Sequence, residues 1–278
     1  MASALRKSYV DGPYGQVHLL ARDPVPSDAA NRAEPPLYLL HATAYSGQTF
    51  EPLMERLART RRVIAPDTPG YGSSDSPPAL PPFEAYANAF VDFIERTADV
   101  DRRPVDVFGY HTGALIATEA AARRPDLVRS LALVGVPYYR AGAEREERRA
   151  ILAERAELTE DFEQFRARWD YFVPDRTPGL SLERGYACFV DELHAYPRHW
   201  WAHEALFTYP AEERLPLVEC PVLVINPDNT LAAPSRDAAR LMPRAEVVEL
   251  PALSNAIFDL GPHLLAEALE RFFERLRG

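Results

Sequence analysis

Short apolar runs alternate with amphipathic segments along most of the chain. The runs are rich in valine, leucine and isoleucine and predict strands at Leu37–Leu40, Val63–Ala65, Val105–Phe108, Leu131–Val136, Val222–Ile225 and Glu246–Leu250. Apolar residues between the runs recur at helical spacing, as in the stripe of Phe83, Tyr86, Phe90, Phe93 and Ile94. Strands that alternate with helices predict an α/β fold, whose mostly parallel sheet is covered by helices on both faces.

The alternation stops between residues 140 and 210. This segment begins with helical sequence rich in glutamate and arginine and continues with closely spaced aromatic residues, among them Trp169, Phe189 and Tyr196. We interpret it as a helical cap inserted into a core that is formed by residues 1–139 and 211–278. Its aromatic side chains form either the core of the cap or the ceiling of an apolar pocket.

The composition narrows the classes of partner. A length of 278 residues gives ample core without disulfides or metals, and Cys188 and Cys220 lack the spacing of either kind of site. The formal net charge of −10 argues against a surface that neutralises phosphates, so we expect no nucleic-acid partner. We find neither a signal peptide nor a run of about 18 apolar residues. We therefore expect a cytoplasmic location and no membrane partner. The sequence leaves open whether the protein forms a homodimer.

A strand, a tight turn and a helix meet around His111. The strand ending at Phe108 runs into Gly109-Tyr110-His111-Thr112-Gly113, and a helix follows. The two glycines leave little bulk beside the turn, so the central side chain is forced out over the carboxyl edge of the sheet. The segment resembles the nucleophile elbow, Gly-x-Ser-x-Gly, of the α/β-hydrolase family, with histidine in the place of serine.

Two further segments carry the same resemblance, which covers the chain from about residue 9 onward. His41-Ala42-Thr43-Ala44 resembles the oxyanion segment of the family, and residues 67–75, Asp-Thr-Pro-Gly-Tyr-Gly-Ser-Ser-Asp, resemble its Asp-x-Pro-Gly-x-Gly-x-Ser loop. The resemblance implies an eight-stranded, mostly parallel sheet. It also implies an oxyanion hole made by the backbone N–H groups of Thr43 and Thr112, beside Ala42. In this family His41 has a structural role more often than a catalytic one, and Tyr110 packs or lines the pocket wall.

The triad that acyl transfer uses in this family is not present. Asn255 stands where the resemblance places the catalytic histidine, and the later His263 falls in the first turn of the last helix, where we expect an exposed side chain. The acid position falls on Asp228 or on Thr230, depending on the register of the loop. Ester hydrolysis through a serine acyl-enzyme is therefore excluded.

A histidine at the elbow can still carry chemistry. A neutral imidazole accepts a proton without a second histidine, and the helix N-terminus after His111 disfavours the imidazolium form. Asn255 can hydrogen-bond one ring nitrogen and leave the other for the pocket. We predict a catalytic set of His111, Asn255 and Asp228, with His111 as general base, in an enzyme that needs no cofactor or metal. Its substrate would be a small apolar or aromatic carbonyl compound, in lyase, isomerase or atypical hydrolase chemistry.

Two other functions remain open. The chain can be a catalytically silent relative that binds a small ligand beneath the cap, or a hydrolase in which His111 is the nucleophile. Three histidines of the cap, His194, His199 and His203, stand at spacings that can share a helical face. Because no cysteine or carboxylate accompanies them, we expect no metal site there.

Overall fold

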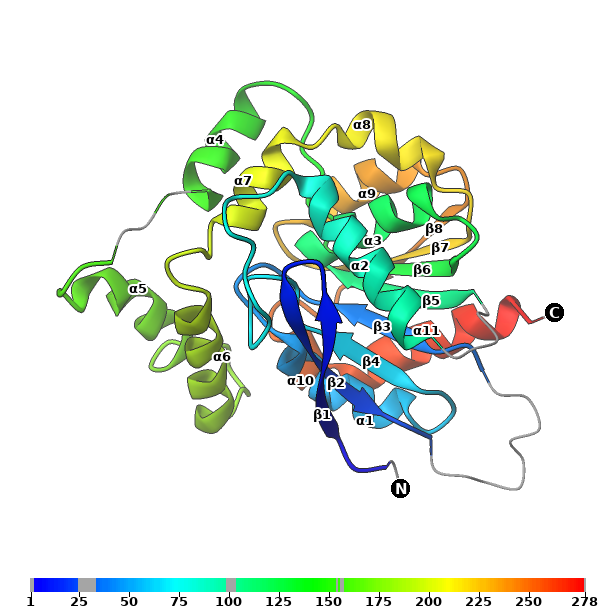
Figure 1. The fold of residues 1–278 in the computed structure, drawn as a ribbon, viewed down its shortest axis with the longest axis horizontal. Coiled ribbons are helices and arrows are strands. Elements are labelled where there is room, and N and C mark those ends of the chain that lie inside the picture. The colour runs from blue at the N-terminus through cyan, green and yellow to red at the C-terminus, as the bar shows by residue number, and fades with distance from the viewer. Residues whose placement is uncertain (1–2, 25–33, 99–103, 154, 156–157, 278) are drawn as a thin grey trace.

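Eight strands form one sheet in a computed structural model, which describes residues 3–24, 34–98, 104–153, 155 and 158–277. The spatial order is β1-β2-β4-β3-β5-β6-β7-β8 (Figure 1). The strands are β1 (Arg6–Gly12), β2 (Gly15–Arg22), β3 (Leu37–Leu40), β4 (Val63–Pro66), β5 (Val105–Tyr110), β6 (Val128–Val134), β7 (Val222–Pro227) and β8 (Ala245–Leu250). β2 pairs antiparallel with β1 and β4, and all other neighbours are parallel. The predicted mostly parallel, eight-stranded α/β sheet is confirmed.

The six strands predicted from apolar runs are all present, with small shifts at their ends. The largest shift is in β6, which begins at Val128 rather than Leu131 and ends at Val134 rather than Val136. The apolar runs did not predict β1 and β2. β1 lies at the edge of the sheet and is largely exposed, so it carries no continuous apolar run.

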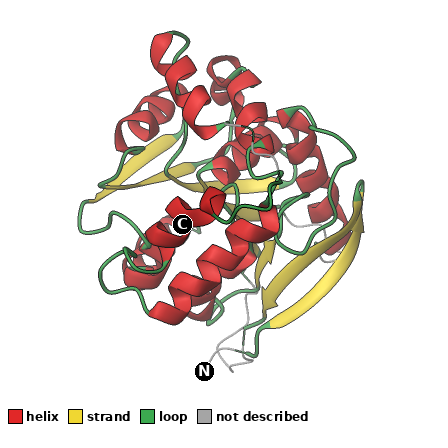
Figure 2. Ribbon diagram, turned by 90° about the vertical axis from the view of Figure 1, so that its left-hand side faces the viewer, coloured by secondary structure: helices red, strands yellow, loops and turns green. Residues whose placement is uncertain are grey.

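Helices cover both faces of the sheet (Figures 1 and 2). They are α1 (Glu51–Leu57), α2 (Phe83–Thr97), α3 (Thr112–Arg123), α4 (Ala143–Leu152), α5 (Glu163–Phe172), α6 (Leu182–Ala195), α7 (Trp201–Thr208), α8 (Ala211–Arg214), α9 (Ala232–Leu241), α10 (Ile257–Leu260) and α11 (Pro262–Arg275), with short 3-10 helices at Gly47–Phe50 and Leu215–Leu217. One apolar core packs the sheet against α2, α3 and α9, and a second packs it against α1, α10 and α11. No helix within the described ranges has the length and apolar character needed to cross a bilayer.

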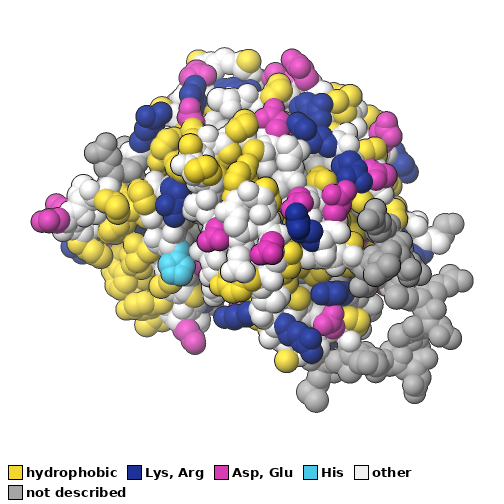
Figure 3. Space-filling view, viewed as in Figure 1, with side chains coloured by type: hydrophobic (Ala, Val, Ile, Leu, Met, Phe, Trp, Pro, Cys, Tyr) yellow, Lys and Arg dark blue, Asp and Glu magenta, His cyan; other side chains and the backbone are white. Residues whose placement is uncertain are grey.

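The segment interpreted as a cap carries α4 to α7, and it is tied to the rest of the chain by polar contacts. The hydroxyl of Ser46 donates to both carboxylate oxygens of Asp191 on α6, at 3.0 and 2.9 Å. Arg184, also on α6, pairs with Asp259 of α10 at 2.8 Å. Hydrophobic side chains gather over the region of α5 and α6 in Figure 3, and these helices bear the exposed Tyr186. Polar contacts thus hold this segment against the rest of the chain, and it exposes hydrophobic side chains elsewhere on its surface.

The turn between β5 and α3 depends on the absence of two side chains. A Cβ atom on Gly113 would lie 2.3 Å from the carbonyl oxygen of Leu40 and 2.7 Å from that of His41. A Cβ atom on Gly109 would lie 2.5 Å from Cα of Ala114. In both cases the neighbour is backbone, which cannot move aside as a flexible side chain can. The first turn of α3 therefore sits directly on the end of β3, and this contact fixes where residue 111 stands.

We expect Gly113→Ala to lower the free energy of unfolding by about 3 kcal/mol, because the added methyl overpacks the contact with β3. Gly142→Ala is the matched control. Gly142 has a φ of +137° but open space around its Cβ position, so only the strained backbone should count, at about 1 kcal/mol. Urea unfolding followed by circular dichroism measures both. Equal losses in the two variants would contradict the close approach of α3 to β3.

Candidate active site

His111 occupies the tip of the turn between β5 and α3. Its backbone has φ 50° and ψ −116°, a conformation that residues other than glycine rarely adopt. Its N–H donates to the carbonyl of Val134 at 3.0 Å, and its own carbonyl accepts from the N–H of Ala114 at 2.8 Å. The sheet and the helix thus hold a strained residue in place, which costs on the order of 1–3 kcal/mol.

The imidazole of His111 is packed between an aromatic ring and a glycine. The centroids of the Tyr110 and His111 rings are 4.0 Å apart. A Cβ atom on Gly135 would lie 2.6 Å from Cδ2 and 2.8 Å from Nε2 of His111, so glycine at this position makes room for the ring. Nε2 is buried and has no hydrogen-bond partner among the described residues. Such an orphaned buried nitrogen is uncommon in folded proteins.

Burial keeps this imidazole neutral at pH 7. Burial, with a smaller contribution from the nearby His203, lowers the pKa of His111 to about 3. The sequence predicted a neutral ring because of the helix N-terminus. The dominant physical cause in the structure is desolvation instead.

The two residues of the predicted oxyanion hole lie side by side. The hydroxyl oxygens of Thr43 and Thr112 are 2.6 Å apart, and both side chains are buried. The backbone N–H of neither residue donates a hydrogen bond within the described part of the chain. Both donors are therefore available to an oxygen atom placed beside His111. Ala42 is also buried here, and its carbonyl accepts from the N–H of Tyr45 at 3.1 Å.

His41 and Tyr110 are engaged with their surroundings. Nε2 of His41 accepts from the N–H of Thr68 at 2.9 Å, and Nδ1 lies 2.8 Å from the carbonyl oxygen of Ala42. With both ring nitrogens bonded to backbone, His41 links the end of β3 to the residue 67–75 loop. Tyr110 packs edge-on against Phe258, with the ring centroids 4.9 Å apart. His41 therefore lacks the unpaired ring nitrogen that distinguishes His111.

The remaining predicted residues lie at the surface. Asn255, Asp228 and Thr230 are exposed, and no hydrogen bond joins their side chains to His111 in the described ranges. The two loops that carry them do meet, because the N–H of Asp228 donates to the carbonyl of Leu253 at 2.8 Å. The structure thus brings Thr43 and Thr112 together beside His111, and leaves Asn255 and Asp228 outside this cluster.

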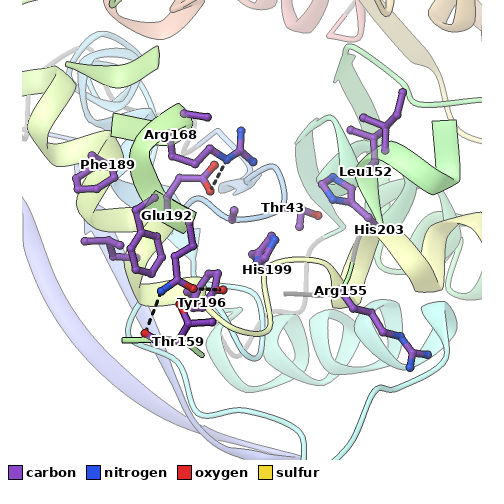
Figure 4. A pocket seen from close by; sticks show the side chains of 16 residues that line it. Thr43, Leu152, Arg155, Thr159, Arg168, Phe189, Glu192, Tyr196, His199 and His203 are labelled. Carbon is purple, nitrogen blue, oxygen red and sulfur yellow. Dashed lines mark hydrogen bonds and ion pairs between the residues drawn. The ribbon is translucent and has the colours of Figure 1, made fainter. Parts of the chain in front are cut away.

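A cavity of about 680 Å³ lies between the core and the cap (Figure 4). Its core side is formed by Thr43 and Ala44, so the cavity reaches the candidate oxyanion hole. Its cap side is lined by apolar residues, among them Leu152, Phe165, Phe189 and Leu193, and by charged or polar residues, among them Arg168, Glu192, His199 and His203. His111 is not among the lining residues. The cavity approaches it through Thr43, whose hydroxyl contacts that of Thr112, the residue after His111.

Two histidines of the cap join the candidate site, and sequence reasoning considered them only as metal ligands. The Nδ1 atoms of His199 and His203 are buried without a hydrogen-bond partner among the described residues, and both side chains line the cavity. Burial lowers the pKa of His203 to about 4. The described residues hold no cluster of three or more potential metal ligands. In the sequence, the four-residue spacing of His199 and His203 indicated a shared helical face. It did not show that this face lines the cavity.

Comparison with known proteins places this geometry in a family. The chain is 34% identical over 112 residues to the (E)-2-((N-methylformamido)methylene)succinate hydrolase of Acinetobacter baylyi, a match that covers 40% of this chain and only 41% of that protein's length. It is 27% identical over 256 residues to the 2-(acetamidomethylene)succinate hydrolase of Mesorhizobium japonicum, covering 86% and 88% of the two chains. A pimeloyl-[acyl-carrier protein] methyl ester esterase of Neisseria meningitidis is 40% identical over 97 residues, which are 35% of this chain and 34% of the esterase.

Solved structures share the fold. The enol-lactonase of Burkholderia xenovorans LB400 superposes with a TM-score of 0.76 at 20% identity, covering 96% of this chain and 100% of the other. The sequence model of the alpha/beta hydrolase family matches residues 37–274, which include β3 to β8, the elbow and the cap. The chain belongs to the alpha/beta hydrolase family.

Proposed function

We propose that the protein is a cofactor-independent enzyme that acts on a small carbonyl compound, with His111 as general base. The observation that carries this proposal is the state of the His111 ring. It is neutral, its Nε2 has no hydrogen-bond partner among the described residues, and it stands beside the unused N–H groups of Thr43 and Thr112. A base and two oxyanion donors at one place suit a reaction that moves a proton and builds negative charge on oxygen.

The steps follow from these groups. A lone pair of the imidazole takes a proton from the carbon next to the carbonyl, and the electrons of the C–H bond move to the carbonyl oxygen. The N–H groups of Thr43 and Thr112 hold the resulting oxyanion, which collapses when a proton returns to carbon or when a neighbouring bond breaks. In the hydrolase reaction His111 takes the proton from a water molecule instead, and the oxygen of that water attacks the carbonyl carbon. The negative charge that builds up on the substrate oxygen raises the proton affinity of His111 during the proton transfer.

The same geometry favours a base over a nucleophile. Nε2 is the less hindered nitrogen for bonding to carbon, and it faces the backbone of Gly135. An acyl group bonded there would need space that this backbone occupies, whereas a base needs the proton-bearing atom to approach only to about 3 Å. Isomerase, lyase and base-assisted hydrolase chemistry are all compatible with a base at this position.

The relatives support a carbonyl substrate. By their names they act on substituted methylenesuccinates and on a methyl ester. The apolar side of the cavity, with Leu152, Phe165 and Phe189, suits an apolar or aromatic body. A volume of about 680 Å³ is ample for a small molecule.

Ligand binding without turnover is the second candidate function. It is favoured by one observation, that the cavity is lined by Thr43 and not by His111. Under this alternative His111 fills the former nucleophile position as packing, and the cap cavity alone is functional.

We expect the protein to catalyse hydrogen–deuterium exchange next to the carbonyl of phenylacetone in heavy water, and His111→Gln to slow the exchange about 100-fold or more. Glutamine keeps a polar side chain of similar length but cannot take the proton. Loss of the proton NMR signal of the exchanging methylene group measures the rate. His263→Gln, on the exposed start of α11, is the control and should match the wild type. Exchange that is no faster than in buffer, together with phenylacetone binding that His111→Gln leaves unchanged, would establish the ligand-binding alternative.

A second prediction concerns stability and pH. The pKa of His111 is about 3 in the folded protein against 6.5 when unfolded, so the unfolded chain binds one more proton between these values. The stability due to the neutral ring is present above pH 6.5 and is lost as the pH falls. Between pH 6 and pH 4 the wild type should lose about 1.4 kcal/mol per pH unit more than His111→Gln. Urea unfolding across this range measures the difference, and parallel curves would contradict a buried neutral imidazole.

The nucleophile alternative has its own test. We expect mass spectrometry of the acid-quenched reaction with p-nitrophenyl acetate to find no acetyl group on His111, because a general base forms no bond to carbon. Acetylation that appears within the first turnover and is absent from the control peptide containing His263 would reassign His111 as a nucleophile.

A further inference from the structure

We propose that the substrate of this site carries a carboxylate, which Arg168 and His199 bind at the cap side of the cavity. The inference rests on the proposed function for the carbonyl end of the molecule. It adds a second anchoring point, which the sequence did not suggest, and it narrows the substrate class to carbonyl compounds with an acidic group.

The charges that line the cavity favour an anion. Among the described residues that line the cavity, two arginines, Arg155 and Arg168, stand against one glutamate, Glu192. These residues carry one positive charge in excess, although the whole chain has a formal net charge of −10. Burial raises the pKa of Glu192, whereas the neighbouring Arg168 acts in the opposite direction. A positive cavity in an acidic protein concentrates small anions and repels cations.

Arg168 has binding capacity to spare. Its Nε lies 3.5 Å from Oε2 of Glu192, and no hydrogen bond to a described residue engages its two terminal nitrogens. The Arg168 side chain is 52% exposed, whereas Glu192 is 10% exposed, so the guanidinium extends from the pair toward open space. Two adjacent N–H groups on a planar guanidinium match the two oxygens of a carboxylate. Arg155 differs, because its guanidinium lies over the Trp200 ring at 5.0 Å.

His199 supplies a second donor or acceptor at the same place. Its ring lies parallel to that of Tyr196, with centroids 5.3 Å apart, and its buried Nδ1 has no hydrogen-bond partner among the described residues. A protonated Nδ1 can donate to a carboxylate oxygen that Arg168 leaves free. Figure 4 shows His199, Thr43 and the Arg168 guanidinium around one space. A ligand with its carbonyl at Thr43 can therefore reach Arg168 with its acidic end.

The half-exposed position of Arg168 suits a charged group. A carboxylate bound there keeps part of its hydration, which avoids the large desolvation cost of a fully buried ion. The carbonyl end meanwhile lies at Thr43, on the core side of the cavity. The two ends of the cavity thus differ, with a half-exposed cation at the cap side and uncharged residues at the core side.

We test the proposal by calorimetric titration with 4-oxopentanoate and 4-oxopentanamide, which share the ketone and differ in charge. The wild type should bind the acid about tenfold more tightly than the amide. Arg168→Gln should abolish this preference and His199→Gln should reduce it. Arg166→Gln is the matched control, because Arg166 lies on the same helix, is equally exposed and does not line the cavity; it should keep the full preference.

The outcomes separate this proposal from the proposed function. His111→Gln should keep the preference for the acid while losing hydrogen–deuterium exchange. If the wild type binds acid and amide equally, binds neither, or keeps its preference in Arg168→Gln, the carboxylate site is wrong whatever the exchange assay shows. If the preference follows Arg168 but exchange does not follow His111, the carboxylate site stands and the role of His111 as a base fails.

Discussion

The site depends on the close approach of α3 to the end of β3. Gly113 has no side chain, and the carbonyl oxygens of Leu40 and His41 occupy the space that a Cβ atom would need. This contact brings Thr43, which follows β3, against Thr112, which opens α3. It also anchors the first turn of α3 directly after the strained residue 111, so one backbone contact positions both threonines beside that residue. The chemistry can change at position 111 while this scaffold stays.

Sequence reasoning predicted six of the eight strands and missed the antiparallel pair of β1 and β2 at one end of the sheet. Central strands such as β5 and β7 are apolar on both faces and read as continuous runs. The edge strand β1 is largely exposed, and its pairing depends on backbone hydrogen bonds that leave little trace in the side chains. The elbow was predictable for the opposite reason, because its glycines are required by a local turn and stand at fixed spacing around His111.

The residues of the candidate site also differ in how well the sequence predicted them. The proximity of Thr43 and Thr112 was predictable because these residues follow the neighbouring strands β3 and β5. Asn255 was placed by analogy with a histidine, yet its side chain is exposed. The proximity of His199 and Arg168 could not be predicted from the sequence, because it depends on how the cap helices pack. Cap packing is tertiary and leaves no local motif.

The turn after β6 provides the space for the imidazole at position 111. Gly135 has a φ of +63°, a backbone conformation that already favours glycine whatever stands opposite it. The space that the His111 ring now fills is thus a by-product of that turn. The ring at position 111 therefore packs against a residue whose identity the turn itself already restricts to glycine.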